Sequence, residues 1–333
     1  MKNQSAAINV ISAEKPCSIP CNLCGSVIVE ELSLVDRDNR YLRTVICREC
    51  GLAWTDPRPE KEDMRRYYSK DYRLKYKGTF EPRMKHIYRA GHVVLSRYER
   101  VRDYLKSGMK TLDVGAGGGE FVYRLKTLGH DASGIEPNEG YAGYAIKEYG
   151  VNVQVGFIQD AELDDAYFDF ITIFHVLEHA EDPLSVLQKL RSWIKPGGTI
   201  VVEVPNIEAV CQAPVHRFHL AHIYSFNEST LVHMGRRAGL DAVEVKFSPD
   251  RGNITVFFRR ADSGMDKPFE GGISGNCEHV LEVVNKHTSF VHFTSSYPYV
   301  RFFNKLRRII DEGLSVGKFT SGKQILDDIF KSA

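Results

Sequence analysis

A glycine-rich segment, Leu112 to Glu120, constrains the fold of this 333-residue chain most strongly. It reads Leu-Asp-Val-Gly-Ala-Gly-Gly-Gly-Glu and joins an apolar stretch at 111–114 to an amphipathic stretch at 120–128. This pattern predicts a buried strand, a tight loop and a helix that ends near Gly129. Glycine permits positive φ and leaves no Cβ between the backbone and a ligand, and the first N–H groups of a helix are free to bind. We therefore expect a ligand to lie against this loop.

The alternation of strand and helix continues from Lys110 to Arg260. Further strands are predicted at 133–135, 169–174 and 199–204, followed by a closing hairpin of 242–247 with 254–258. Further helices are predicted at 81–106, 141–148, 183–194 and 227–238, the last of them capped by Asn227. This order is typical of an α/β protein with a doubly wound, mostly parallel sheet that helices cover on both faces.

Two acidic residues restrict the ligand that the loop can hold. A dinucleotide-binding fingerprint needs glycine at 115, 117 and 120, but residue 120 is a glutamate that would repel a pyrophosphate. Glu136 ends the second predicted strand, 21 residues after Gly115, where its carboxylate could accept hydrogen bonds from both hydroxyls of a ribose. A nicotinamide dinucleotide is therefore disfavoured.

The pattern Asp-x-Gly-x-Gly-x-Gly at 113–119 resembles motif I of the class I S-adenosylmethionine (SAM) dependent methyltransferases. The segments 159–161, 170–179 and 193–199 resemble later motifs of that family and stand in the same order. The resemblance covers roughly 111–260 and implies a Rossmann-like fold with SAM as the cofactor. It places these residues at the cofactor: Asp113, Gly115, Gly117, Gly119, Glu136, Pro137, Asp160, Ala161, Phe174 and His175. Asp160 could instead be a solvated residue of an acidic loop.

Four of the seven cysteines form two Cys-x-x-Cys pairs near the N-terminus, Cys21 with Cys24 and Cys47 with Cys50. Each pair can supply two thiolates to a tetrahedral Zn²⁺. The 22 residues between the pairs can form a hairpin with strands at 26–35 and 41–46, and a glycine follows each pair. A structural zinc ribbon is therefore predicted. A redox-active pair is the alternative, and Cys17 could compete as a ligand.

This ribbon, followed by Pro-Arg-Pro and a Tyr-rich helical segment, resembles an N-terminal arrangement in bacterial methyltransferases of sugar and natural-product pathways. The resemblance implies that the ribbon helps to wall the acceptor pocket and takes no part in the chemistry. The predicted organisation is a tail at 1–16, the zinc ribbon at 17–60, a helical linker or lid at 61–108, the methyltransferase domain at 109–261 and a helical extension at 262–333.

Three histidines are candidates for a catalytic base, because histidine exchanges protons near neutral pH. They are His175, His179 and His222. The first two flank the end of the fourth predicted strand, and the third closes a histidine cluster at 216–222. His175, Glu178 and His179 also resemble the Glu-x-x-Glu-His metal site of quinone-biosynthesis O-methyltransferases, with histidine in the first position. Packing on the cofactor and capping of a turn are equally compatible with His175 and His179.

The chain carries 44 Lys and Arg against 43 Asp and Glu, so its net charge is +1. This balance, without a basic run interleaved with aromatic residues, argues against nucleic acid as a partner. No segment resembles a signal peptide or a membrane span, so a cytoplasmic location is expected, and an oligomer is compatible with the sequence. Five basic residues could bind an anionic small-molecule acceptor, or they could form a solvated helix face. They are Arg217, Arg301, Lys305, Arg307 and Arg308.

Together these features predict an enzyme that transfers a methyl group from SAM to a hydroxyl of a sugar, glycoconjugate or natural product. Methylation of a carbon or nitrogen atom of a nucleotide sugar is one alternative. RNA base methylation is another, since some RNA methyltransferases combine a zinc module with this fold. A degenerate scaffold without turnover is a third, which the intact glycine loop and Glu136 disfavour.

Overall fold

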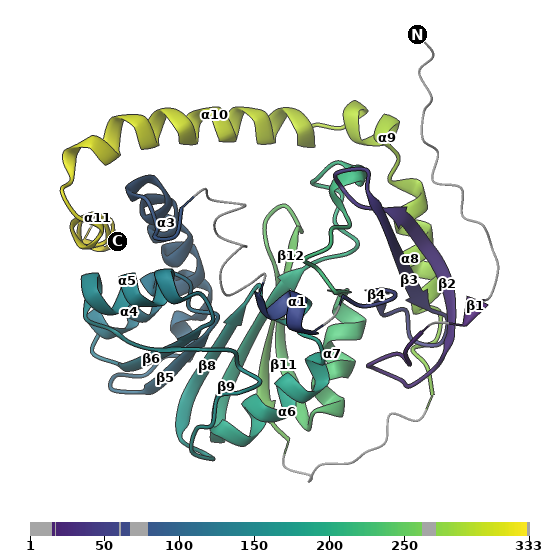
Figure 1. Cartoon of the computed structure of the whole chain (residues 1–333), viewed down its shortest axis with the longest axis horizontal. Helices are drawn as coiled ribbons and strands as arrows, with labels where there is room; N and C mark the ends of the chain where they lie inside the picture. The colour runs from purple at the N-terminus through teal and green to yellow at the C-terminus, as the bar shows by residue number, and fades with distance from the viewer. Residues whose placement is uncertain (1–14, 17, 60, 67–78, 262–270, 332–333) are drawn as a thin grey trace. The chain divides into compact units, whose positions relative to one another are not determined.

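The computed structural model describes the chain except for residues 1–14, 17, 60, 67–78, 262–270 and 332–333. Its described residues include one sheet of seven strands and one of five (Figure 1). The chain divides into two compact units. Unit 1 comprises 1–58, 175–188 and 203–302, and unit 2 comprises 59–174, 189–202 and 303–333.

The seven-stranded sheet has the order β11-β12-β9-β8-β5-β6-β7. Its strands are β5 (Lys110–Val114), β6 (Asp131–Glu136), β7 (Asn152–Val155), β8 (Phe168–Phe174), β9 (Ile194–Pro205), β11 (Leu240–Phe247) and β12 (Asn253–Arg260). The central strand β5 pairs in parallel with β6 and β8, and β6 pairs in parallel with β7. The predicted hairpin is confirmed, because β11 and β12 are antiparallel at the other edge. The predicted doubly wound, mostly parallel fold is therefore confirmed, and the strand order reverses beside β5, where such sheets bind ligands.

Helices alternate with these strands: α3 (Met84–Val101), α4 (Glu120–Thr127), α5 (Glu139–Tyr149), α6 (Pro183–Trp193) and α7 (Glu228–Arg237). The cap predicted for the last of them is confirmed. The Asn227 side chain accepts a hydrogen bond from the Thr230 N–H at 3.0 Å, and Thr230 Oγ1 accepts one from the Asn227 N–H at 3.0 Å. The predicted helix at 81–106 is shorter at both ends, since a 3₁₀ turn at Arg102–Tyr104 follows α3.

One boundary differs from the prediction for a local reason. Strand β9 begins at Ile194, although the Lys-Pro-Gly-Gly segment predicted a turn before a strand at 199–204. Gly197 does adopt a left-handed φ of 78°. A Cβ on Gly198 would lie 2.9 Å from the Asp169 carbonyl oxygen, so this glycine lets the neighbouring backbone approach. The turn residues are thus part of an irregular strand.

In unit 2, the last helix, α11 (Gly322–Lys331), packs beside α3 (Figure 1). Gly91 of α3 permits this contact, because a Cβ there would lie 2.8 Å from Ile329 Cδ1. Ile329 is buried, together with Ile325, Leu326 and Phe330 of the same helix. The Arg89 guanidinium of α3 also forms an ion pair with Glu312. The short helix α1 (Lys61–Arg66) belongs to unit 2 as well.

In unit 1, the five-stranded sheet has the order β1-β2-β3-β4-β10. Its strands are β1 (Lys15–Pro16), β2 (Ile28–Val35), β3 (Tyr41–Cys47), β4 (Ala53–Thr55) and β10 (Tyr224–Ser225). The hairpin predicted between the cysteine pairs is confirmed as β2 and β3. Because β10 pairs with β4, the N-terminal sheet also includes a segment from the second half of the chain.

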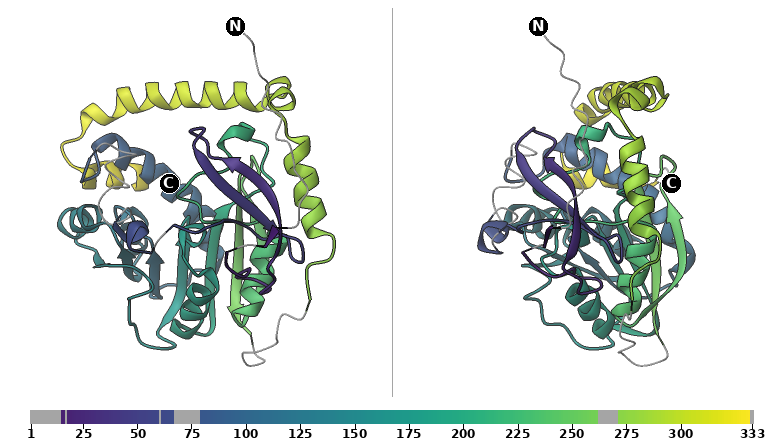
Figure 2. Two further views of the ribbon diagram at one scale, coloured as in Figure 1. Left: turned by 45° about the vertical axis from the view of Figure 1, so that its right-hand side comes forward. Right: turned by 90° about the vertical axis from the view of Figure 1, so that its right-hand side faces the viewer.

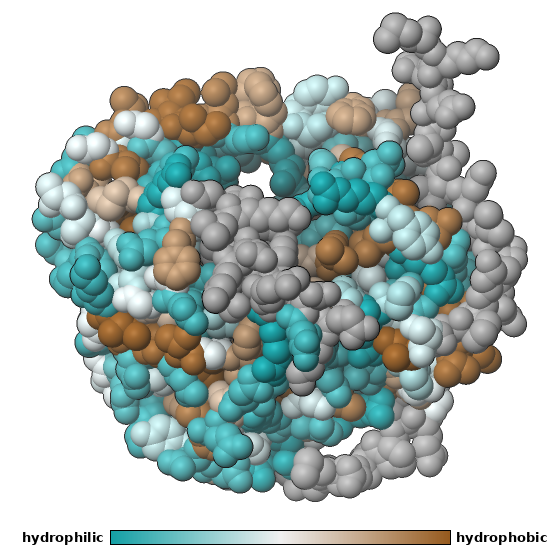
Figure 3. Space-filling view, in the orientation of Figure 1, coloured by the Kyte–Doolittle hydropathy of each residue, from teal (hydrophilic) through white to brown (hydrophobic). Residues whose placement is uncertain are grey.

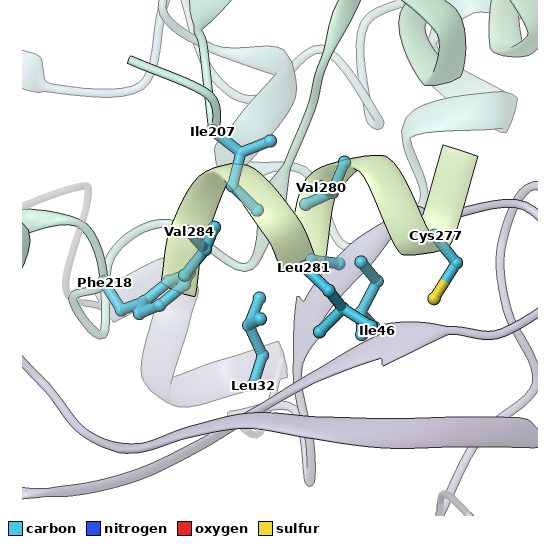
Figure 4. Close-up of a cluster of buried hydrophobic side chains, with 9 residues drawn as sticks. Leu32, Ile46, Ile207, Phe218, Cys277, Val280, Leu281 and Val284 are labelled. Carbon is cyan, nitrogen blue, oxygen red and sulfur yellow. The ribbon is translucent and has the colours of Figure 1, made fainter. Parts of the chain in front are cut away.

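A hydrophobic core lies between this hairpin and helix α8 (Asn276–Lys286), which runs beside it in both views of Figure 2. Figure 4 shows the side chains that meet there: Leu32 and Ile46 from the hairpin, Ile207 and Phe218 from the loop after β9, and Cys277, Val280, Leu281 and Val284 from α8. The ribbon, this loop and α8 thus share one core, so burial of apolar surface stabilises them together.

The C-terminal extension is helical as predicted and continues with α9 (Ser289–Thr294) and α10 (Tyr297–Ser315) before α11. Helix α10 presents a row of exposed apolar side chains, including Phe302, Phe303 and Leu314, which accounts for the brown surface along the top edge of Figure 3. Within the described part of the chain, no helix combines the length and the apolar character that crossing a membrane requires.

Candidate functional site

The glycine loop in unit 2 has the backbone conformation that its sequence predicts. Gly115, Gly117 and Gly119 have φ of 76°, 58° and 77°, a region that residues with a Cβ rarely adopt. At Gly119 a Cβ would also lie 2.6 Å from the Ala145 Cβ of helix α5. The loop therefore requires glycine for both conformation and space.

Glu136, at the end of β6, is tied to this loop. Its Oε2 accepts a hydrogen bond from the Gly117 N–H at 2.8 Å, and its Oε1 accepts one from the Asn138 N–H at 3.0 Å. The side chain is buried, with 4% relative exposure. An ionised carboxylate can accept about four hydrogen bonds, so Glu136 retains acceptor capacity for the two hydroxyls of a ribose. Pro137 follows it and lets the chain leave the sheet toward α5.

Asp113 of β5 is buried, with 5% relative exposure, and its Oδ1 accepts a hydrogen bond from Thr172 Oγ1 of β8 at 2.7 Å. Burial raises the pKa of Asp113 to about 6, although the hydrogen bond from Thr172 acts in the opposite direction. The carboxylate thus bridges two central strands. Its predicted contact with the cofactor stays a prediction.

Asp113→Asn is expected to stabilise the folded chain in a pH-dependent way. Because the folded-state pKa is raised, the folded chain binds this proton more tightly than the unfolded chain does. The resulting stability is present below about pH 4 and is lost as the pH rises through about 6. The substitution should therefore raise the free energy of unfolding by up to about 3 kcal/mol near pH 7.5 and leave it nearly unchanged near pH 4. Urea unfolding at both pH values measures this, and an equal gain at both would contradict it.

Asp160 and Ala161, in the loop after β7, differ in exposure. Ala161 is buried, with 2% relative exposure. The Asp160 carboxylate is half-exposed and accepts two hydrogen bonds from the Arg65 guanidinium of α1, at 2.7 and 2.8 Å. The same guanidinium lies 5.1 Å from the centre of the Phe157 ring. Sequence reasoning missed Arg65, because nothing in the local pattern pairs residues so far apart in the chain.

Phe174, the last residue of β8, is buried, with 6% relative exposure. The Arg97 guanidinium lies 4.4 Å from the centre of its ring, and the Phe121 ring meets it edge-on at 5.4 Å. In unit 2 the structure thus places Phe174 against α3 and α4. His175 follows it directly in the chain and begins the second segment of unit 1.

His175 lies between two buried carboxylates. Its Nδ1 is 3.4 Å from Glu178 Oε1, and its Nε2 is 3.4 Å from Glu203 Oε1. The exposed fractions of the Glu178 and Glu203 side chains are 1% and 2%, against 34% for His175. His175 also has a left-handed φ of 55°, which is uncommon for a residue with a Cβ and is found at sites where function imposes strain. Sequence reasoning missed Glu203, which lies on β9.

The other two candidate bases surround Glu178. His179 Nε2 is 3.7 Å and His222 Nε2 is 4.0 Å from Glu178 Oε1, and His179 Nδ1 donates to the Ala221 carbonyl oxygen at 2.5 Å. Burial acts to raise the pKa of Glu178, but the neighbouring His179 and His175 outweigh it and lower that pKa. Ligand atoms of Glu178, His179 and His222 all lie within 4.8 Å of one another. This group shares Glu178 and His179 with the predicted set and has His222 as its third member. His175 also lies 3.4 Å from Glu178, and its predicted part in a metal site stays a prediction.

A cavity of about 630 Å³ lies beside these histidines within unit 1. His175 and His222 line it, and polar side chains make up most of the remaining wall. The wall comes from three places: the tip of the β2–β3 hairpin, the loop between β9 and α7, and the start of β12. This volume suits a small organic molecule.

The four predicted zinc ligands meet at one end of the five-stranded sheet. The Sγ atoms of Cys21 and Cys50 are 3.5 Å apart, those of Cys24 and Cys47 are 3.4 Å apart, and all four lie within 4.8 Å of one another. Four thiolates on one zinc ion lie about 3.8 Å apart, so this cluster fits Zn²⁺. Hydrogen bonds from neighbouring thiols, Cys21 first, lower the pKa of Cys47, whereas that of Cys50 is raised. A metal ion binds cysteine as the thiolate, so zinc bound among the four sulfur atoms would stabilise their deprotonated forms.

The backbone around the cysteines also has the form of two zinc knuckles. The Gly25 N–H donates to the Cys21 carbonyl at 2.8 Å, and the Gly51 N–H donates to the Cys47 carbonyl at 2.9 Å. Both glycines adopt positive φ, 77° and 76°. The described cysteines are free thiols, and the competing candidate Cys17 lies outside the described residues.

Comparisons with known proteins identify a methyltransferase domain in this chain. Residues 84–245 match the family model described as a methyltransferase domain. The ubiquinone biosynthesis O-methyltransferase of Methylococcus capsulatus is 37% identical over 106 residues, which cover 30% of this chain and 45% of that protein. The corresponding enzyme of Paraburkholderia phymatum is 31% identical over 157 residues, covering 42% of this chain and 68% of that protein. The chain thus spans about half the length of the first of these relatives.

A solved SAM-dependent methyltransferase from Mesorhizobium loti is 18% identical, with a TM-score of 0.44, and the match covers 50% of this chain and 98% of that one. The fold and the glycine loop define a Rossmann-like, SAM-binding class of enzyme. The chain belongs to the class I SAM-dependent methyltransferases. The two relatives named above are enzymes of ubiquinone biosynthesis, so they lend no support to the expected sugar or natural-product acceptor.

Proposed function

We propose that this chain transfers a methyl group from SAM to a hydroxyl oxygen of a small molecule bound in the cavity of unit 1. The observation that carries the proposal is the position of His175, which lines the cavity and has a buried carboxylate near each ring nitrogen. The relatives named as O-methyltransferases support oxygen as the acceptor atom. Methylation of a carbon or nitrogen atom and methylation of an RNA base stay alternatives. The cytoplasmic location and the oligomeric state stay predictions.

Bound SAM would supply a methyl group that its sulfonium activates for displacement. The residues proposed to hold it are those of the loop Gly115–Gly119, with Asp113 behind it, and Glu136 and Pro137 for the ribose. Asp160 and Ala161 are proposed to contact the adenine. In this structure the Asp160 carboxylate accepts two hydrogen bonds from the Arg65 guanidinium. Phe174 would lie at the reacting end, because it ends the strand beside the loop, and His175 is proposed there because it follows Phe174 directly in the chain.

His175 would act as the general base. Its imidazole would take the proton of the acceptor hydroxyl as the oxygen bonds to the methyl carbon. The carboxylates of Glu178 and Glu203 would stabilise the imidazolium that forms, because opposite charges attract strongly in a site with little water. Among the three candidates, His175 is the best placed, since it lines the cavity and remains the most exposed.

His179 and His222 would have supporting roles. His179 is fixed by its bond to the Ala221 carbonyl, and its Nε2 lies 3.7 Å from Glu178 Oε1, where a protonated ring would attract the carboxylate. His222 lines the cavity, and burial lowers its pKa well below the ordinary value, so it is neutral and suited to orient a hydroxyl. The zinc ion would be structural. It would hold the ribbon whose hairpin forms part of the cavity wall.

His175→Ala is expected to lower kcat for methyl transfer by about 10²–10⁴-fold, the usual contribution of a general base. The measurement is the rate of S-adenosylhomocysteine formation with a saturating acceptor. His233→Ala is the matched control, because His233 lies on α7 and bonds to the Ser229 carbonyl away from the cavity. A His175 variant with the kcat of the wild type would contradict the assignment.

A further inference from the structure

Two arginines from distant parts of the sequence face the same cavity. Arg37 lies at the tip of the β2–β3 hairpin, and Arg217 lies in the loop between β9 and α7. The Arg37 N–H donates to the carbonyl oxygen of Phe218 at 2.9 Å, which ties the hairpin tip to that loop. The zinc ribbon thus contributes a cationic side chain to the proposed acceptor pocket.

Arg217 is held rigidly and lacks a compensating charge. Its Nη1 donates to the Ile207 carbonyl oxygen, and its Nη2 donates to His287 Nδ1 at 2.7 Å. Burial lowers the pKa of Arg217 to about 10 and that of His287 to about 4, so at neutral pH the guanidinium is charged and the imidazole is neutral. No carboxylate of the described residues forms an ion pair with Arg217. A partly buried cation without an opposite charge is costly to maintain.

The rest of the described wall carries few acidic side chains. Among the described residues that line the cavity, Asp38 is the one with a carboxylate. Burial lowers the pKa of His219 to about 4, and the positive charge of Arg37 acts in the same direction. Burial also lowers the pKa of His222 well below its ordinary value, so the cavity contains two guanidinium groups, one carboxylate and the neutral imidazoles of His219 and His222. Asn206, Ser225 and Asn253 add uncharged hydrogen-bonding groups to the wall.

We propose that the acceptor is a polar, hydroxylated molecule that carries a phosphate or diphosphate group, and that Arg37 and Arg217 bind that group. Guanidinium groups bind phosphate oxygens through paired, charge-assisted hydrogen bonds, which a lysine cannot reproduce. The neutral polar side chains would bind the hydroxyls, one of which would face His175. This inference rests on the proposed function, because it identifies the class of molecule that occupies the same pocket.

The structure also revises which basic residues meet the anion. The sequence analysis grouped Arg217 with four basic residues of the C-terminal extension. Those four do not line the cavity: Arg301, Lys305, Arg307 and Arg308. Arg301 instead donates to the Cys211 carbonyl at 3.3 Å, and the other three are exposed on α10. Arg37 was missed, because only the folded hairpin brings it beside Arg217.

Titration of the zinc-loaded full chain with inorganic pyrophosphate tests this directly. We expect Arg37→Met and Arg217→Met each to weaken pyrophosphate binding by at least about tenfold, or ~1.4 kcal/mol. Arg217→Lys should retain part of the affinity, because it keeps the charge but loses the planar fork. Arg236→Met is the matched control, since Arg236 is exposed on α7 outside the cavity, and it should bind like the wild type.

The absence of pyrophosphate binding to the wild type would overturn the inference, as would unchanged binding in Arg37→Met. An equal loss in Arg236→Met would also overturn it, since binding would then depend only on overall charge. If Arg217→Met fails to fold, Arg37→Met still decides the matter, because the hairpin turn is held by backbone bonds to the Asp36 carboxylate. Titration of the same proteins with SAM separates the two proposals. Wild-type protein that does not bind SAM would refute the proposed function, whereas the pyrophosphate titration tests the anion site independently of SAM.

Discussion

Glu136→Ala is expected to weaken SAM binding by at least about 100-fold, because two charge-assisted hydrogen bonds to the ribose are lost, each worth about 1.5–3 kcal/mol. The substitution also removes the acceptor of the Gly117 N–H, so the glycine loop loses a bond that fixes its shape. Isothermal titration of the purified chain with SAM measures the affinity.

The controls for this experiment use neighbouring acids. Glu139→Ala removes an exposed carboxylate from the first turn of α5 and should leave SAM affinity unchanged. Glu136→Gln keeps the shape of the side chain and should retain more affinity than alanine. Circular dichroism must show that each variant is folded. A folded Glu136→Ala variant with wild-type affinity would refute the ribose assignment.

Cys47→Ser is expected to remove the bound zinc and to abolish methyl transfer. Structural zinc contributes about 10–16 kcal/mol in small zinc domains, so the ribbon should lose its fold without it. The hairpin tip, which places Arg37 and Asp38 on the cavity wall, would then be lost as well. The glycine loop and Glu136 belong to unit 2, so SAM binding should persist in this variant.

Elemental analysis of freshly purified protein measures the zinc, and one equivalent per chain is expected for the wild type. Cys211→Ser is the matched control, because Cys211 is a buried thiol outside the four-cysteine cluster and should retain its zinc. Wild-type protein without zinc, or a Cys47→Ser variant with full activity, would contradict the structural role of the ribbon.

The features that the sequence could predict are those in which neighbouring residues determine the structure. The loop 115–119 required glycine because its φ values are positive, and the two Cys-x-x-Cys pairs required close approach of four thiols. The Asn227 cap similarly depends on Thr230, only three residues away. Continuous apolar runs then sufficed to predict central strands such as β8, since a strand buried on both faces is apolar along its whole length.

The features that the sequence could not predict depend on residues far apart in the chain. Glu203 meets His175 only because β9 ends beside the residue that follows β8. Arg65 meets Asp160, and Arg37 meets the loop of Arg217, through the same kind of long-range packing. The contact of α11 with Gly91 is another example. Single charged residues carry no periodic signal, so their partners appear only in the folded chain.

We propose that this chain methylates a hydroxyl oxygen with SAM. Its most direct test incubates the zinc-loaded protein with SAM labelled with ¹³C at the methyl group and a panel of phosphorylated and unphosphorylated sugars and phenols. We expect S-adenosylhomocysteine together with a ¹³C resonance of an O-methyl group, and we expect both to fall by about 10²–10⁴-fold in initial rate in His175→Ala. A labelled C-methyl or N-methyl product, or SAM that binds without any transfer across the panel, would contradict it.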